Sequence, residues 1–401
     1  MKKKIQSYAL FAFIFLLFLG LLFAINARIT PHLSGGGEFR VAWQGTRNFL
    51  FEQKDPYSVK AAEAIQEEFY GRPAREGEYP YRLDLPLYML FLYLPFALLE
   101  DFHLARALWL SFAEIAFLGV GFLSIRLTDW KASRLHLILF FLALFLSFYG
   151  IAALSFGASA IFTALIFLLA LIAFAEGMDE ALAALLLFGS LHAGEGGLAF
   201  LFILFLIFRA RRWRVLSMML MSLIALLGIS FIISGDWFLP FLSSFLANLR
   251  AADGLLFSEM LQRWLPTKAN LVSQVIKWGL LLLLLLEWRK TREQDFQHLL
   301  WTASLSLVLT PFLGVPLKAT LYPFLFLPLA LIFKTAKDRW QRAEWLIAPL
   351  LLLLLSTEII LWKFPQSYSL LAYLYPFLLL IGLYWVRWWI VRPPRTWADQ
   401  L

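Results

Sequence analysis

The stretch YALFAFIFLLFLGLLFAINA, Tyr8 to Ala27, is long and apolar enough to cross a bilayer. A helix needs about 20 predominantly apolar residues to span a hydrocarbon core of about 30 Å. Lys2 to Lys4 precede the run, which exceeds the usual apolar core of a cleaved signal peptide. We therefore expect a retained signal anchor with these lysines in the cytoplasm.

Similar runs follow along the whole chain of 401 residues, of which 61% are hydrophobic and only 15% are charged. Soluble domains carry roughly 25% charged residues, and a membrane β-barrel would show short alternating segments instead of long runs. The composition predicts an all-α, multi-pass protein of the cell (inner) membrane, with residues 1–401 forming a single integral membrane domain.

The basic residues gather between the apolar runs, which is typical of cytoplasmic loops. The net charge of +8 therefore predicts orientation and does not indicate a nucleic acid partner. Both termini are expected in the cytoplasm, so the number of crossings is even, and we expect about 12 transmembrane helices. One of the short segments 85–99, 181–193 and 197–208 is expected not to cross. The candidate spans are 5–27, 85–99, 104–127, 135–153, 158–175, 181–193, 197–208, 215–234, 271–286, 298–313, 320–333, 344–362 and 370–390.

No metal or cofactor site is expected. The chain has no cysteine, so disulfides and thiolate metal sites are excluded. Its histidines are too dispersed for the spacing of a zinc site. They are His32, His103, His136, His192 and His298.

Two polar stretches, 28–84 and 235–270, are too long to be turns, and both are expected on the non-cytoplasmic face as the first and second extracytoplasmic loops. Each contains apolar residues at helical spacing, which predicts interfacial helices in these outer loops. The periodic positions are Phe39, Trp43, Thr46 and Leu50 in the first loop and Phe238, Phe241, Phe245 and Leu249 in the second.

The first loop contains GGGEFRVAWQGTRNFLFEQKDPYS, residues 35–58, in which three glycines precede Glu38. Glycine adopts backbone conformations that are closed to other residues, and a carboxylate in a first helical turn is stabilised in its ionised form by the helix dipole. Such a carboxylate can act as a general base toward an attacking hydroxyl. The alternative is that Glu38 serves only as an acidic residue at a helix N-terminus.

This segment resembles the first outer loop of membrane glycosyltransferases of the GT-C superfamily, most closely glycosyltransferase family 87. The matching pieces are the acidic Glu38, the aromatic helix 39–51, the Asp55-Pro56-Tyr57 element and YPYRLDLPLYMLFLYLPFALL, which enters the next span. The resemblance extends more weakly through the hairpin 181–214, and beyond it lies only in hydropathy.

The resemblance implies a GT-C-type fold and a hexosyltransferase. Its donor would be a polyprenyl-phosphate sugar in the membrane lipids, with mannose as the first expectation. The acceptor would be a hydroxyl of a lipid or glycan on the non-cytoplasmic face. By motif position, Glu38 would be the catalytic base, in an externally open chamber.

The chain departs from the family pattern at three places. Glu38 stands where the family usually has aspartate, Gly157-Ala158 where it often has Gly-Gln, and Glu195-Gly196 where a Lys-Pro often opens a later span. A lipid phosphate needs positive charge or hydrogen-bond donors, so other groups must supply them. Arginine can place two parallel hydrogen bonds on a phosphate.

The remaining candidates for substrate binding are cations, aromatic residues and a polar hairpin. Each has a plain alternative, because cations snorkel to lipid headgroups and aromatic residues gather at membrane interfaces in general. The candidates are Arg82, Lys318 and Arg47 for phosphate, Trp43 and Tyr57 for sugar, and His192 and Glu195 in the hairpin HAGEGG.

Two other functions fit the pattern. A transporter or flippase for a lipid-linked or anionic glycan would use the ionisable residues inside the apolar segments, Glu114, Lys277 and Glu358, where each charge costs about 2.5–3.5 kcal/mol. The alternative is that these residues form an ion pair inside the protein or that the carboxyl groups stay protonated. A catalytically silent GT-C-like binding subunit is the second alternative, which the altered Gly-Gln and Lys-Pro positions favour.

Overall fold

The computed structural model describes residues 2–75, 78–189, 193–251, 254–291, 295–363 and 368–391. Within these residues the regular structure is helical, apart from one isolated β-bridge between Leu255 and Leu317. This agrees with the all-α prediction. The chain divides into two compact units. Unit 1 is Met1–Ala116, Leu154–Ser159 and Ala225–Ala252, and unit 2 is Phe117–Ala153, Ala160–Ile224 and Asp253–Leu401.

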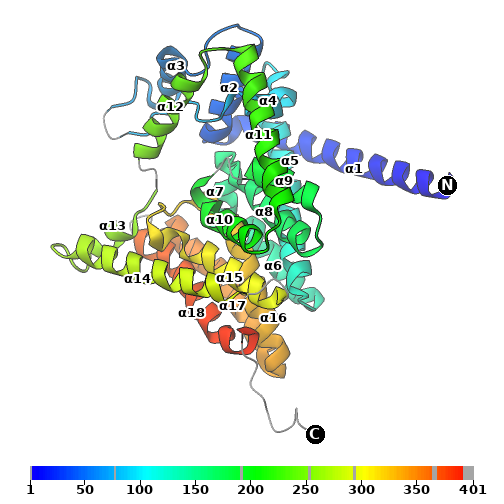
Figure 1. The fold of residues 1–401 in the computed structure, drawn as a ribbon, viewed down its shortest axis with the longest axis vertical. Helices are drawn as coiled ribbons and strands as arrows, with labels where there is room; N and C mark the ends of the chain where they lie inside the picture. Colours follow the sequence, from blue (N-terminus) through cyan, green and yellow to red (C-terminus); the bar gives the residue numbers. More distant parts are fainter. Residues whose placement is uncertain are drawn as a thin grey trace. The chain divides into compact units, whose positions relative to one another are not determined.

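Unit 1 contains the candidate base, the whole first polar stretch and part of the second. Its helices α2, α3, α4 and α12 lie close together in Figure 1. Its elements are α1 (Lys2–Ile29), η1 (Thr30–His32), α2 (Gly37–Leu50), α3 (Val59–Tyr70), η2 (Leu87–Met89), α4 (Leu90–Ala97), the first part of α5 (Phe102–Thr128), the ends of α7 (Phe148–Phe156) and α11 (Trp213–Ile233), and α12 (Phe238–Arg250).

Unit 2 is a bundle in which α15 packs against α10, α14, α16 and α18. Besides the remaining parts of α5, α7 and α11, its elements are α6 (Arg134–Leu146), α8 (Ala160–Ala175), α9 (Asp179–Gly189), α10 (Ala193–Arg209), α13 (Phe257–Gln262), α14 (Ala269–Lys290), α15 (Phe296–Leu309), η3 (Thr310–Leu313), η4 (Ala319–Leu325), α16 (Phe326–Arg339), η5 (Gln341–Ala343), α17 (Glu344–Lys363) and α18 (Tyr368–Val391).

Seven helices among the described residues are long and apolar enough to cross a membrane. The number is eight if the bent pair α6 and α7 forms one span, and four further apolar helices are shorter. A multi-pass membrane protein is therefore supported, whereas about 12 crossings would require all four shorter helices to cross as well.

The long helices differ in how much of their surface the protein covers. In the apolar windows of α1 and α11 only 6% of the residues are buried, against 83% in Phe296–Leu313 and 89% in Ala319–Arg339. An apolar helix with an open surface is stable in lipid because the acyl chains solvate it. The first pair therefore suits a lipid environment, and the second pair forms the core of unit 2.

The predicted span 135–153 is not one straight helix. It is broken between α6 and α7, which are bent by 48°. Ser147 at the break is extended (φ −65°, ψ 152°). A Cβ at Gly150 would lie 2.1 Å from the carbonyl oxygen of Leu144, so only glycine permits this close return of the backbone.

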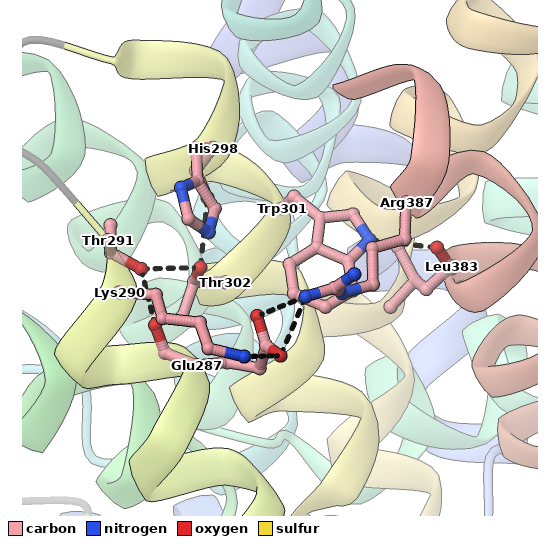
Figure 2. A network of polar contacts seen from close by, with 8 residues as sticks. All are labelled: Glu287, Lys290, Thr291, His298, Trp301, Thr302, Leu383 and Arg387. Atoms are coloured by element: carbon pink, nitrogen blue, oxygen red, sulfur yellow. Dashed lines mark hydrogen bonds and ion pairs between the residues drawn. The ribbon is translucent and has the colours of Figure 1, made fainter. Parts of the chain in front are cut away.

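A buried ionic network joins α14, α15 and α18 in unit 2 (Figure 2). Glu287 is 6% exposed and accepts hydrogen bonds of 2.8 and 3.0 Å from Arg387, with Lys290 at 3.4 Å. The Arg387 guanidinium also lies over the ring of Trp301, whose indole N–H donates to the carbonyl oxygen of Leu383. Lys290 pairs with Glu287 within α14, whereas Arg387 links α18 to Glu287 on α14 and to Trp301 on α15, so the network fixes how these three helices pack.

Candidate functional site

Helix α2 places Glu38 in its first turn. Gly35 and Gly36 precede the helix with φ values of 89° and 85°, a left-handed conformation that glycine adopts without strain. Phe39 and Trp43 are buried on one face, at the spacing that predicted an amphipathic helix over 39–51. The observed α2 therefore confirms the helix and its buried face.

Arg106 of α5 holds the glycine loop in place. The side chain is 1% exposed, and its guanidinium donates to the carbonyl oxygens of Leu33, Ser34 and Ser155 at 2.7, 2.9 and 2.7 Å. A Cβ at Gly36 would lie 2.8 Å from the Arg106 Nε. One buried cation thus ties the start of α2 to the segment 154–159, which belongs to the same unit.

The segment 154–159 reaches the candidate base directly. Ser159 donates a hydrogen bond of 2.9 Å to Glu38 Oε1. Gly157 has φ 69°, its carbonyl oxygen accepts from the Trp109 indole at 3.1 Å, and a Cβ there would lie 2.8 Å from Phe39 Cβ. The position where the resemblance expects Gly-Gln is therefore next to Glu38, with a serine one residue further supplying the polar contact.

Aromatic rings pack beneath the first turn of α2. Phe39 stacks on Trp109 with ring centroids 4.9 Å apart, and Trp109 stacks on Tyr93 at 5.2 Å. The negative charges of Glu38 and Asp84 both act on the phenol of Tyr93. Glu38 itself is exposed. Its carboxylate is therefore accessible at the surface of unit 1, next to this stack of aromatic rings.

The segment before α4 runs along α2. The Tyr81 side chain occupies the space that a side chain at Gly37 would need, and the Leu83 side chain occupies the space that one at Gly45 would need. Arg82 sits between them, and its main-chain N–H and carbonyl are both bonded to the side chain of Asn248. The two polar stretches of the chain therefore meet within unit 1.

The guanidinium of Arg82 is available for an anion. Its Nε is buried without a hydrogen-bond partner, and within the described parts of the chain it has no ion pair with a carboxylate. An unsatisfied buried donor costs about 1–3 kcal/mol. A bound anion would recover that energy.

Two other predicted binding residues have structural partners. Trp43 is 5% exposed, and its indole N–H donates to the carbonyl oxygens of Phe96 and Leu99, both at 3.2 Å. Arg47 donates to the carbonyl oxygen of Ala97 at 2.8 Å. Both side chains hold the end of α4 against α2, which accounts for them without a substrate.

Tyr57 lines an open cavity of about 460 Å³ between the end of α2 and the start of α12. Its hydroxyl donates to the carbonyl oxygen of Leu85 at 2.8 Å. Burial raises the pKa of Tyr57, and the negative charges of Asp55 and Asp84 raise it further. The phenol therefore stays neutral and keeps its hydrogen bond. Glu38 does not line this cavity.

Three predicted site residues lie in other parts of the chain. Lys318 precedes η4 in unit 2, His192 lies outside the described residues, and Glu195 belongs to α10 with a side chain that is not described.

The structure shows local contacts for two of the three residues that the transporter alternative would use. The Asn26 amide of α1 donates to Glu114 at 3.0 Å and to Ser111 at 3.1 Å, so Glu114 is part of a contact between α1 and α5. The Lys277 ammonium lies over Gly314. Glu358 belongs to α17, and its side chain is not described.

Sequence reasoning missed three residues of the site, Arg106, Ser159 and Asp84. Arg106 carried a signal, because a lone arginine near the start of an apolar span needs buried partners. Ser159 and Asp84 gave no such signal in the sequence. Ser159 contacts Glu38 and Asp84 acts on Tyr93 only because the fold brings these segments together.

The described residues contain no group of three or more His, Cys, Asp or Glu side chains that could hold a metal ion. The chain matches no protein-family model, no characterised protein and no solved structure. The function must therefore be argued from the site.

Proposed function

We propose that this protein is a membrane glycosyltransferase that moves a hexose, mannose-like by resemblance, from a polyprenyl-phosphate carrier to a hydroxyl of a lipid or glycan. The observation that carries the proposal is the setting of Glu38. An exposed carboxylate stands in the first turn of α2, with one oxygen bonded to Ser159 and its loop fixed by Arg106. Such a fixed, accessible carboxylate suits a general base.

In the proposed reaction, Glu38 takes the proton of the acceptor hydroxyl as its oxygen bonds to the first carbon of the sugar. The bond between that carbon and the phosphate oxygen breaks, and polyprenyl phosphate leaves with the electron pair. General-base assistance of this kind contributes about 10²–10⁴-fold in rate. Attack from the side opposite the leaving group inverts the sugar carbon.

Arg82 is the proposed partner of the donor phosphate. It lies on the segment that packs along α2, and it has a buried donor without a partner among the described residues. An arginine bonded to the leaving phosphate stabilises the charge that develops there. Lys318 is a second proposed cation.

The test uses purified full-length protein in proteoliposomes with a labelled polyprenyl-phosphate sugar, and follows release of polyprenyl phosphate. Glu38→Gln is compared with Glu63→Gln, an exposed acid on α3. We expect a loss of at least about 100-fold for the first and no change for the second. Glu38→Asp keeps the acid but shortens its reach, so we expect a smaller loss, up to about 100-fold.

The results separate the proposal from its rivals. Turnover that survives Glu38→Gln removes Glu38 as the base. Carrier binding by the wild type without any transfer favours a silent binding subunit, and movement of the carrier across the bilayer without transfer favours a flippase. On the proposal, Arg82→Met raises the KM for the donor more than it lowers kcat.

A further inference from the structure

The cavity between α2 and α12, called here the α2–α12 cavity, is separate from the site around Glu38. It is lined by Gln53, Lys54, Asp55, Ser234 and Asp236 among others, and its volume is about 460 Å³. Cavities that bind small molecules commonly measure about 300–1,000 Å³. The space therefore suits a ligand of one or two sugar units.

The charges around the cavity exclude an anion. Asp55 and Asp236 are both carboxylates, and the ammonium of Lys54 is already 2.7 Å from a Glu52 oxygen. A phosphate or a carboxylate ligand would meet net negative charge. A divalent cation is also disfavoured, because no set of three candidate ligands is present in the described chain. The polar side chains that line the cavity can instead form hydrogen bonds with neutral hydroxyl groups.

The wall of the cavity has an unused donor and a strained residue. The indole N–H of Trp237 is buried and finds no acceptor among the described residues, although the side chain is only 3% exposed. Gln53 has φ 52°, a left-handed conformation that is uncommon for a residue with a side chain. Strain of this kind is often kept where a side chain has a ligand to contact.

We infer that the α2–α12 cavity binds a neutral saccharide. Carboxylates of Asp55 and Asp236 accept hydrogen bonds from its hydroxyls, Gln53 donates and accepts, and Phe49 and Pro240 cover its apolar faces. Asp55 Oδ1 already accepts from the Tyr57 main chain at 2.9 Å, so its second oxygen serves the ligand.

The position of the cavity along α2 indicates which kind of acceptor it binds, and this step rests on the proposed function. Glu38 is in the first turn of α2, and Phe49, which lines the cavity, is in the last. With a rise of 1.5 Å per residue, positions 38 and 49 are about 16 Å apart along the axis. A sugar in the cavity cannot react at Glu38. It is a distant unit of an extended glycan whose reacting hydroxyl lies near Glu38.

The experiment measures binding to the full-length protein in nanodiscs, since detergents with sugar headgroups would compete. The probes are the neutral trisaccharides maltotriose, mannotriose and cellotriose, with glucose 6-phosphate as an anionic sugar. Asp236→Ala removes an exposed carboxylate of the cavity, and Gln53→Gly removes the amide while relieving the left-handed strain, so both variants should fold. Glu63→Ala is the matched control outside the cavity.

We expect at least one neutral trisaccharide to bind the wild type, with affinity reduced tenfold or more in both cavity variants and unchanged in Glu63→Ala. Glucose 6-phosphate should bind more weakly. The inference is overturned if the wild type binds no neutral saccharide, if the cavity variants bind as the wild type does, or if the anionic sugar binds best.

Failure of the inference and failure of the proposed function look different. Glu38→Gln should bind the trisaccharide normally while losing turnover. In the transfer assay the cavity variants should raise KM for an oligosaccharide acceptor without lowering kcat. Cavity-dependent binding by a wild type that transfers no sugar refutes the glycosyltransferase and leaves the binding site standing. Transfer without cavity-dependent binding refutes the cavity inference alone.

Discussion

Replacing Arg106 by Met should destabilise unit 1 more than replacing any exposed arginine. The guanidinium supplies three hydrogen bonds to main-chain carbonyl oxygens, and the side chain is 1% exposed. Each charge-assisted bond contributes about 1.5–3 kcal/mol, and burying the cation offsets part of the sum. Arg106→Met leaves three carbonyl oxygens without a donor, at about 1–3 kcal/mol each, so we expect a net loss of about 3–5 kcal/mol. The main cost is that the carbonyls of Leu33, Ser34 and Ser155 lose their partner.

The assay is thermal unfolding of the purified protein in nanodiscs, together with limited proteolysis of the glycine loop. At about 2–4 °C per kcal/mol, the Arg106→Met midpoint should fall by roughly 6 °C or more. Arg106→Lys keeps the charge but cannot present a planar fork, so it should lose most of the same stability. Gly36→Ala should act similarly, because its Cβ would meet the guanidinium at 2.8 Å.

The control is Arg75→Met, an exposed arginine of the same unit whose change should stay within about 0.5 kcal/mol. If Arg106→Met has the same unfolding midpoint and the same rate of proteolysis as Arg75→Met, the Arg106 guanidinium does not organise the glycine loop. The account of how Glu38 is positioned would then be wrong, whatever the activity measurements show.

Three further changes test other parts of the structure. Gly157→Ala, in a left-handed position, should cost about 1–2 kcal/mol in thermal unfolding; no loss would contradict the tight turn. The hydrogen bond from Arg72 lowers the pKa of Glu78 from 4.5 to about 2, so this stabilisation is present above pH 4.5 and is lost as the pH falls through 2. Hydrogen exchange of the Arg75 amide, corrected for intrinsic rates, should rise over that window in the wild type and not in Glu78→Gln. Glu287→Gln should cost about 3 kcal/mol, whereas Glu287→Met with Arg387→Met should be nearly neutral, because only the single change leaves a buried charge unpaired.

Much of the fold could be predicted because span length and helical periodicity are local properties of the sequence. The segment 104–127 became α5 (Phe102–Thr128), and 271–286 became α14 (Ala269–Lys290). The break inside 135–153 was missed because both halves are equally apolar. Only the backbone at Ser147 and the close approach at Gly150 show it.

The site was predictable only in part, because its polar contacts join segments far apart in the chain. Glu38 and the helix it begins followed from three glycines and an apolar stripe. The hydrogen bond from Ser159 crosses 121 positions of sequence, and no spacing rule in a single sequence indicates such a pairing. Trp43 and Arg47 were candidates for substrate by residue type, but the carbonyls at the end of α4 already bind them.

Glu38, which departs from the pattern of the resembled family, contacts Ser159, the residue that follows a second departure at Gly157-Ala158. Glutamate at position 38 extends the carboxylate by one methylene relative to aspartate, and Ser159 places a hydroxyl one residue beyond Gly157-Ala158. The bond of 2.9 Å between them exists with this longer acid. With the backbone held by Arg106 and by the left-handed Gly157, an aspartate would fall short of Ser159. The glutamate is therefore matched to its neighbour, and its extra length is no sign of a lost function by itself.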